Sequence, residues 1–194
     1  MSFDNWLRLV PARREPRLRF VCFPHAGGSA SFFRSWAGHL PDGVELAAAC
    51  YPGREDRIAD PLPRPMADLA GPLATACARL PELPMVFFGH SMGASVAYET
   101  ALGLERDYGV SVAALCVSGR AAPGYERVRE PVPDDDDALA REVARLGGTD
   151  RAVLDGELRE LGGHFYLNGD PAGLARDILN QVGVARRQES VILR

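Results

Sequence analysis

The stretch that most constrains the fold of this chain is residues 85–93, Met-Val-Phe-Phe-Gly-His-Ser-Met-Gly. It opens with an apolar run, which is typical of a short buried strand. The pattern G-x-S-x-G follows, and an apolar run with helical spacing begins at Ala94. A serine on a sharp turn between strand and helix needs small residues two positions before and after it, because neighbouring backbone passes close by. We therefore expect Ser91 to be a nucleophile, exposed at the positive end of the following helix.

The segments around this stretch alternate between strand-like and helix-like patterns. Strands are predicted at 18–24, 44–50, 85–90 and 112–118, and helices at 29–40, 66–80 and directly after the serine. This alternation favours a parallel, doubly wound α/β sheet with helices on its faces. Residues 1–17 are interpreted as an exposed lead-in. Since the chain has 194 residues, we expect a single domain, 1–194, with a real hydrophobic core.

Composition argues against several classes of protein. A net charge of −4 gives no reason to expect nucleic acid as a partner. The N-terminus lacks the apolar region of a signal peptide and no run reaches transmembrane length, so we expect a cytoplasmic protein without a membrane partner. The four cysteines are far apart and form no C-x-x-C pair, so we expect buried reduced thiols and no metal site. They are Cys22, Cys50, Cys77 and Cys116.

Residues 125–161 differ in character from the strand-forming part of the chain. The acidic run Pro131–Asp137 begins an amphipathic helix, Gly147–Thr149 ends it, and a second short helix covers about 151–161. An acidic helical insertion after a sheet strand is the position of a lid over an active site. We therefore predict a helical lid at 125–161; the alternative is a peripheral helical pair with no gating role.

A nucleophilic serine needs a base, and histidine is suited to this because its ordinary pKa is about 6.5. The chain has four histidines. His164 is predicted to be the base, since it lies C-terminal to the serine and follows two glycines that suit a loop. His90 adjoins the serine but is expected to point elsewhere from a tight turn. His39 is expected at the surface, and His25 in the loop after the first predicted strand.

The oxyanion formed during acyl transfer needs two backbone N–H donors. One is expected from the residue after the nucleophile, Met92. The other is expected from the loop at His25–Gly28, where small residues let the backbone approach a substrate, and we assign it to Ala26. The alternative for this loop is a simple strand-to-helix turn.

Six motifs occur in an order that resembles one known family. They are Phe23–Ser29, Tyr51–Arg57, Phe88–Ala94, Val117–Arg120, Arg145–Thr149 and Gly162–Leu167. Together they resemble the type II (external, editing) thioesterases of polyketide and nonribosomal peptide biosynthesis, over nearly the whole chain.

The resemblance implies an α/β-hydrolase fold, a mainly parallel sheet flanked by helices, with a helical lid insertion. It also implies a serine hydrolase that removes aberrant or stalled acyl groups from the phosphopantetheine arms of acyl or peptidyl carrier proteins. Ser91 would be the nucleophile, His164 the base, and Ala26 and Met92 the oxyanion donors. No metal and no cofactor of its own would be needed, because the phosphopantetheine belongs to the partner.

The chain departs from the family pattern between residues 161 and 162. In the family, the rest of the lid, a strand ending in the triad aspartate, a helix and a further strand precede the Gly-Gly-His motif. Here Glu157–Leu161 runs directly into Gly162, so a block of about 30 residues or more is absent. The triad aspartate is therefore unassigned, and Asp155 is the least unsuitable replacement. Less suitable are Asp107, Asp134–Asp137, Asp150 and Asp170.

Two accounts of this departure are open. Either the sequence omits a segment of the natural protein, or the chain is shortened, with a four-stranded sheet and an impaired triad. Losing two sheet strands would expose a parallel edge, which favours the first account. The second would favour a catalytically impaired protein that binds carrier proteins or regulates them. A third reading, a general carboxylesterase, keeps the chemistry and changes the substrate.

Overall fold

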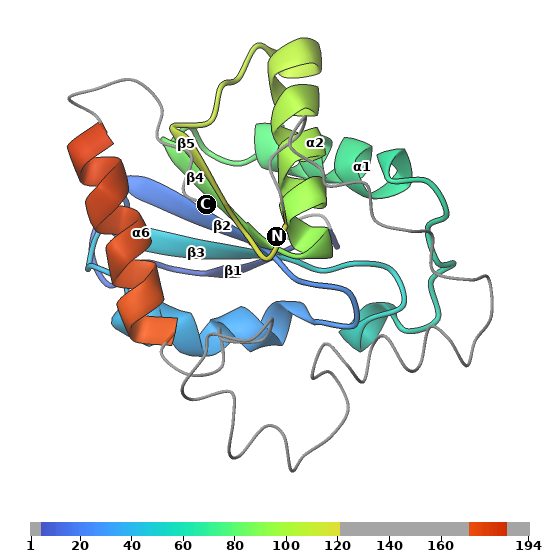
Figure 1. The fold of residues 1–194 in the computed structure, drawn as a ribbon, viewed down its shortest axis with the longest axis horizontal. Helices are drawn as coiled ribbons and strands as arrows, with labels where there is room; N and C mark the ends of the chain where they lie inside the picture. The colour runs from blue at the N-terminus through green and yellow to red at the C-terminus, as the bar shows by residue number, and fades with distance from the viewer. Residues whose placement is uncertain (1–4, 121–170, 186–194) are drawn as a thin grey trace.

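The fold of a computed structural model, which describes residues 5–120 and 171–185, is built on a mainly parallel sheet (Figure 1). Within these residues the sheet has five strands in the order β1-β3-β2-β4-β5. The pair β1–β3 is antiparallel, and the other three pairs are parallel. The strands are β1 Leu7–Val10, β2 Leu18–Phe23, β3 Val44–Ala49, β4 Met85–His90 and β5 Ala114–Ser118. The predicted mainly parallel sheet is therefore confirmed.

The interpretation of residues 1–17 as an exposed lead-in was wrong for residues 7–10, whereas residues 13–17 are exposed as predicted. Leu7–Val10 forms β1, and Leu7 pairs with Ala49 at the antiparallel edge of the sheet. Leu7 is buried, and the carbonyl of Trp6 accepts a hydrogen bond of 2.8 Å from the Cys50 N–H. A strand of four residues carries little periodicity of its own. It is ordered by pairing with β3, which is a tertiary effect that local sequence does not reveal.

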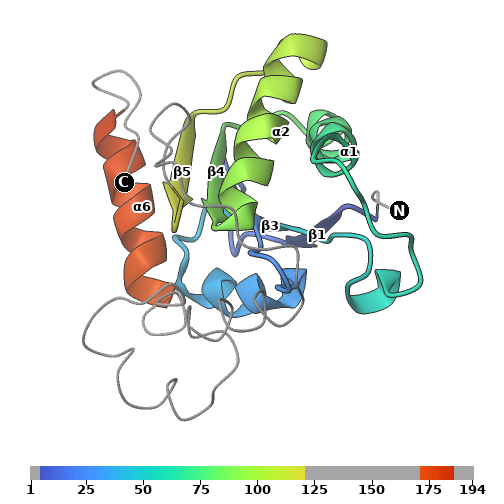
Figure 2. The ribbon, with the colours of Figure 1, turned by 45° about the vertical axis from the view of Figure 1, so that its right-hand side comes forward.

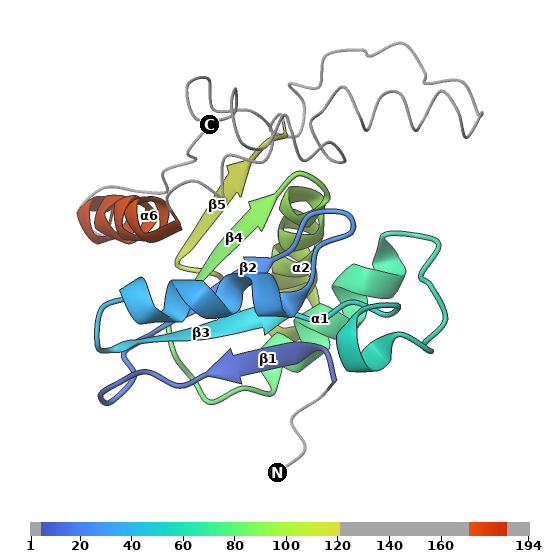
Figure 3. The ribbon, with the colours of Figure 1, turned by 90° about the horizontal axis from the view of Figure 1, so that it is seen from below.

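Helices cover both faces of the sheet (Figure 2). On one face lie α1 Ala67–Ala78 and α2 Met92–Tyr108, side by side. On the other face lie η1 Ala30–His39, which crosses β2 and β3 in Figure 3, and α6 Pro171–Ala185, which contacts η1. The predicted helix at 29–40 is present, but its ten residues are wound as a 3₁₀ helix. A second 3₁₀ turn, η2, spans Glu55–Arg57.

Each face of the sheet has its own hydrophobic core. Alternate residues of β2 point to opposite faces, so that Val21 and Phe23 join the core under α1 and α2. Phe20 and Cys22 join the core under η1 and α6. There Trp36 of η1 packs between aromatic rings, with centroids 5.4 Å from Phe88 and 6.4 Å from Phe20.

The four cysteines are buried and free, as predicted. Burial raises the pKa of the Cys77 thiol to about 12 and that of Cys116 to about 11, which keeps both thiols protonated. The predicted lid, 125–161, lies outside the described residues. Among the helices that the structure describes, none combines the length and apolar character needed to cross a membrane.

Three loops meet at the carboxyl ends of β2, β4 and β5, because these strands are parallel and in register. Phe23 of β2 pairs with Gly89 of β4, and His90 of β4 pairs with Ser118 of β5. The segments that follow these strands therefore start at the same level and side by side. They are the His25–Gly28 loop, the turn at Ser91 and the segment that begins at Gly119.

Candidate active site

Ser91 occupies a strained turn between β4 and α2. Its backbone angles are φ 55° and ψ −119°, a region that residues with a side chain seldom adopt. Such a conformation persists only where the surroundings enforce it, and it is common at active sites. The Ser91 N–H donates to the Ser118 carbonyl at 2.8 Å, and the Ser91 carbonyl accepts from the Ala94 N–H at 3.0 Å. The half-buried Ser91 therefore has the backbone geometry that the sequence pattern predicts for an elbow.

The two glycines of the pattern are required by close backbone contacts. A Cβ atom on Gly89 would lie 2.2 Å from the Gly93 carbonyl oxygen. A Cβ atom on Gly93 would lie 2.1 Å from the carbonyl oxygen of Phe23 and 2.6 Å from that of Pro24. Both distances are far inside van der Waals contact, so the steric reason given for the glycine spacing is confirmed. The second contact also shows that α2 begins directly against the end of β2.

The loop after β2 is held beside this helix start. Gly27 has a φ of 78°, and the Gly28 N–H closes a turn on the His25 carbonyl at 3.0 Å. The buried hydroxyl of Tyr51 donates to the Pro24 carbonyl at 3.1 Å. Ala26 lies at the exposed tip of this loop.

Met92 is the first residue of α2, where backbone N–H groups have no acceptor within the helix and attract negative charge. The structure thus brings the two predicted oxyanion donors, Ala26 and Met92, to the carboxyl ends of the strands, where Ser91 also lies. Their role as donors remains a prediction.

Of the four histidines, three lie in the described residues. His90 is fully buried and shares a hydrogen bond of 3.0 Å between its Nδ1 and the Ser118 Oγ, so it points into the sheet edge, as expected. His25 lies against it, with ring centroids 6.1 Å apart at an angle of 80°. His39 is exposed at the end of η1, as predicted. His164, the predicted base, lies outside the described residues.

The structure excludes one of the weighed replacements for the triad acid. Asp107 lies near the C-terminal end of α2, about 24 Å from Ser91 at the usual rise per helical residue. It forms an exposed ion pair with Arg106 at 2.7 Å, and this hydrogen-bonded guanidinium lowers the pKa of the Asp107 carboxyl. Asp155 and the other candidates, Asp134–Asp137, Asp150 and Asp170, lie outside the described residues.

The motif at Tyr51–Arg57 supports the scaffold, a role that sequence reasoning had not assigned. The guanidinium of Arg57, a largely buried side chain, lies 4.2 Å from the centroid of the Trp6 ring. It donates to the Cys50 carbonyl at 2.9 Å and pairs with Asp60 at 2.7 Å. This arginine therefore fastens the start of β1 to the loop after β3. The acidic residues on either side of Arg57, Asp56 and Asp60, could have signalled an ion pair, but not the aromatic partner of the arginine.

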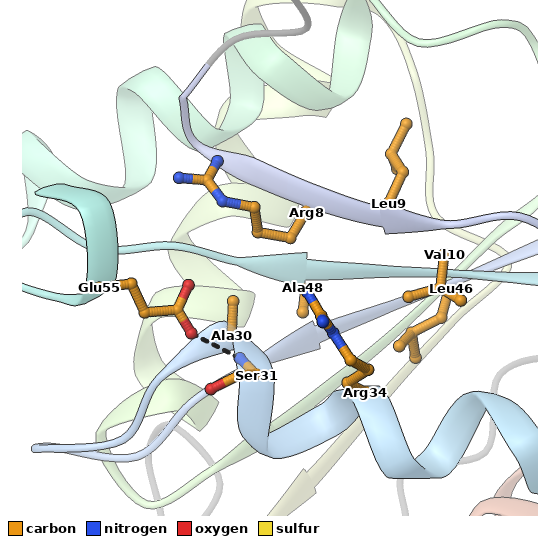
Figure 4. A pocket seen from close by; sticks show the side chains of 9 residues that line it. All are labelled: Arg8, Leu9, Val10, Ala30, Ser31, Arg34, Leu46, Ala48 and Glu55. Atoms are coloured by element: carbon orange, nitrogen blue, oxygen red, sulfur yellow. Dashed lines mark hydrogen bonds between the residues drawn. The ribbon is translucent and has the colours of Figure 1, made fainter.

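A small pocket lies between η1 and the β1 edge of the sheet (Figure 4). Its volume of about 30 Å³ has room for about one water molecule. At its wall the Ser31 N–H donates to Glu55 at 2.7 Å. Burial by itself would raise the pKa of Glu55, but the hydrogen bonds from Ser31 and Cys50 and the charge of Arg8 lower it overall.

Next to this pocket is one cluster of possible metal ligands, with ligand atoms within 4.8 Å of one another. It comprises Cys50, Glu55 and Asp56. Arg8 already pairs with Asp56 at 2.5 Å, and burial raises the pKa of the Cys50 thiol. A cysteine binds a metal ion as the thiolate, and Asp56 is already paired with a guanidinium, so these residues do not suit a metal ion.

Residues 19–163 match the model of the thioesterase domain family. The chain belongs to this family. One relative is a probable cadicidin biosynthesis thioesterase of Streptomyces griseus, which is 41% identical over 79% of this chain and 42% of the relative. Another is the thioesterase PikA5 of Streptomyces venezuelae, which is 43% identical over 80% of this chain and 56% of the relative.

A solved structure, the type II thioesterase BorB from the borrelidin biosynthetic cluster, matches this thioesterase-family chain with a TM-score of 0.66 and 35% identity. The match covers 81% of this chain and 64% of BorB. The predicted α/β-hydrolase fold class and the resemblance to biosynthetic type II thioesterases are therefore confirmed. The thioesterase-family chain spans about half the length of the curated relatives it matches.

Sequence reasoning missed three supports of this site. They are the Tyr51 hydroxyl on Pro24, the Ser118 contacts to Ser91 and His90, and the packing of His25 against His90. Tyr51, Ser118 and His25 each belong to one of the motifs that resemble the family. The partners of these residues lie on or after other strands, however, and only the folded chain shows which atoms are in contact.

Proposed function

We propose that this chain is a serine hydrolase of acyl thioesters that removes aberrant or stalled acyl groups from carrier proteins in polyketide or nonribosomal peptide biosynthesis. The observation that carries the proposal is the strained backbone of Ser91 at the start of α2, beside the loop after β2. Two similar proteins, thioesterases of cadicidin biosynthesis and of the borrelidin biosynthetic cluster, support the substrate class.

In the proposed reaction the Ser91 hydroxyl attacks the carbonyl carbon of the thioester. The oxyanion is held by the backbone N–H groups of Ala26 and Met92, and the positive end of α2 favours the developing charge. The carbon–sulfur bond then breaks, and the thiol leaves with the proton that the serine gave up. Water adds to the acyl-serine, releases the carboxylic acid and returns a proton to Ser91.

His164 is proposed as the group that carries these protons, with the acid that orients it still unassigned. No metal and no cofactor of this chain enters the proposal, because the phosphopantetheine that carries the thiol belongs to the partner. The proposed partners are acyl or peptidyl carrier proteins, and the proposed location is the cytoplasm.

The direct test measures release of a radiolabelled acyl group from a loaded carrier protein. We expect the wild-type chain to release it and Ser91→Ala to lose at least about a thousandfold, because the nucleophile is gone. Ser95→Ala is the matched control, since Ser95 lies one turn further along α2 and its hydroxyl has no partner among the described residues. Release that survives in Ser91→Ala would overturn the proposal.

The two other readings are separated in parallel. A fluorophosphonate probe labels Ser91 if the serine is activated, whereas a carrier-binding protein with an impaired triad stays unlabelled. A general carboxylesterase would cleave an oxygen ester at least as well as the matched acyl-pantetheine thioester. We expect labelling at Ser91 and a preference for the thioester.

A further inference from the structure

Ser118, the last residue of β5, contacts the elbow through its backbone and its side chain. Its carbonyl accepts the Ser91 N–H at 2.8 Å, and its hydroxyl shares a hydrogen bond of 3.0 Å with Nδ1 of His90. His90 is opposite Ser118 in the parallel register of β4 and β5. Two consecutive residues, the nucleophile and the one before it, are thus bonded to a single residue of the neighbouring strand.

These two bonds act where the backbone is strained. Ser91 has a positive φ of 55°, which costs free energy that the surrounding contacts must offset. The bond to the Ser118 carbonyl fixes the peptide plane that leads into this residue. The bond to the Ser118 hydroxyl fixes the ring of His90, which is fully buried and has no room to turn independently of its backbone.

The His90 ring extends this constraint to the loop after β2. Its edge packs against the His25 ring, with centroids 6.1 Å apart at 80°. The His25 ring in turn lies under the loop, since its Cε1 is 3.1 Å from where a Cβ on Gly28 would stand. The next residue after His25 is Ala26, the proposed oxyanion donor. The T-shaped pair of rings therefore connects Ser118 to both sides of the proposed site.

We propose that Ser118 is a positioning residue, whose hydroxyl sets the distance between the Ser91 hydroxyl and the Ala26 N–H through the rings of His90 and His25. The proposal rests on the proposed thioesterase function. It predicts an effect on the chemical step rather than on binding, because displacement of an oxyanion donor weakens interactions made in the transition state.

The test uses two variants of equal shape at this position. Ser118→Thr keeps the hydroxyl, and Ser118→Val replaces it with a methyl group, while both suit a strand. With an acyl-pantetheine substrate, we expect Ser118→Val to lower kcat about tenfold, with KM changed less than about twofold, and Ser118→Thr to retain at least about half of the wild-type kcat. Equal kcat in the two variants, or a loss confined to KM, overturns the proposal.

A second measurement does not depend on turnover. The exchange rate of the Ser91 amide hydrogen, followed by NMR without substrate, reports whether the elbow is held. We expect Ser118→Val to speed exchange at Ser91 several-fold and Ser118→Thr to leave it near the wild-type rate. If the wild-type chain hydrolyses no thioester, the proposed function fails, and the positioning role is then judged by this exchange rate alone. An identical rate in Val and Thr variants would refute it.

Discussion

Replacing Gly93 by alanine tests the contact between the nucleophile turn and the loop after β2. The added Cβ would stand 2.1 Å from the Phe23 carbonyl oxygen and 2.6 Å from that of Pro24. A carbon and a carbonyl oxygen pack at about 3.3 Å or more, so the two backbones must separate by about 1 Å. Both obstructing atoms belong to the main chain, and no side-chain rotation can relieve the clash.

A displacement of about 1 Å at a catalytic group typically costs about a hundredfold in rate. We therefore expect Gly93→Ala to lower kcat for acyl-pantetheine hydrolysis by about that factor. The strain should also lower the free energy of unfolding by about 1–3 kcal/mol, measured by urea denaturation.

The matched control for this substitution is Gly71→Ala. Gly71 is exposed within α1, and a Cβ there would meet nothing within 4 Å. Alanine is the better helix former, but Pro72 follows and disfavours a helical residue with a Cβ before it, so we expect the stability of the control to stay within about 1 kcal/mol of wild type with unchanged kcat. If Gly93→Ala folds and hydrolyses substrate within threefold of wild type, the steric account of the elbow is refuted.

Three further results are expected. Tyr51→Phe removes the hydrogen bond to the Pro24 carbonyl, so urea denaturation should show a loss of about 1–2 kcal/mol, and an unchanged value would contradict a role for that bond. Because the folded pKa of Glu55 is lowered, its stabilising effect is complete above the ordinary pKa of 4.5 and fades as pH falls through the folded value, so the stabilities of wild type and Glu55→Gln should converge on acidification. If the sequence omits a segment of the natural protein between residues 161 and 162, that protein should yield no tryptic peptide 160–176. Recovery of this continuous peptide would show that no segment is omitted.

The central strands and the elbow could be predicted because their signals are local. β2 and β4 are buried along nearly their whole length, so their sequences are mostly apolar, with Arg19 and His90 as the exceptions. The glycines around Ser91 indicate close backbone contacts, since a residue with a Cβ does not fit at either position. By contrast, β1 has four residues and is ordered by its pairing with β3, which leaves almost no pattern in the sequence.

The contacts that hold the candidate site could not be predicted, because each joins residues that lie on or just after different strands. Ser118 reaches His90, and Tyr51 reaches Pro24, only after the sheet has set the register. The stacking of Arg57 on Trp6 depends on β1, the strand that the sequence did not reveal. Sequence reasoning therefore proposed the reacting groups and left the contacts around them unassigned.

The register of the parallel strands is what makes these supports possible. Pro24, Ser91 and Gly119 each follow the end of a strand, and the pairings Phe23–Gly89 and His90–Ser118 bring those ends to one level. Each segment of the proposed site is then held by a neighbour, the loop after β2 by Tyr51, which follows β3, and the turn after β4 by Ser118 of β5. A shift of β5 by one residue along β4 would turn the Ser118 side chain to the opposite face of the sheet and remove the hydroxyl from His90. The strained conformation of Ser91 therefore depends on β5 keeping its place beside β4, so the geometry of the proposed nucleophile depends on the pairing of these two strands.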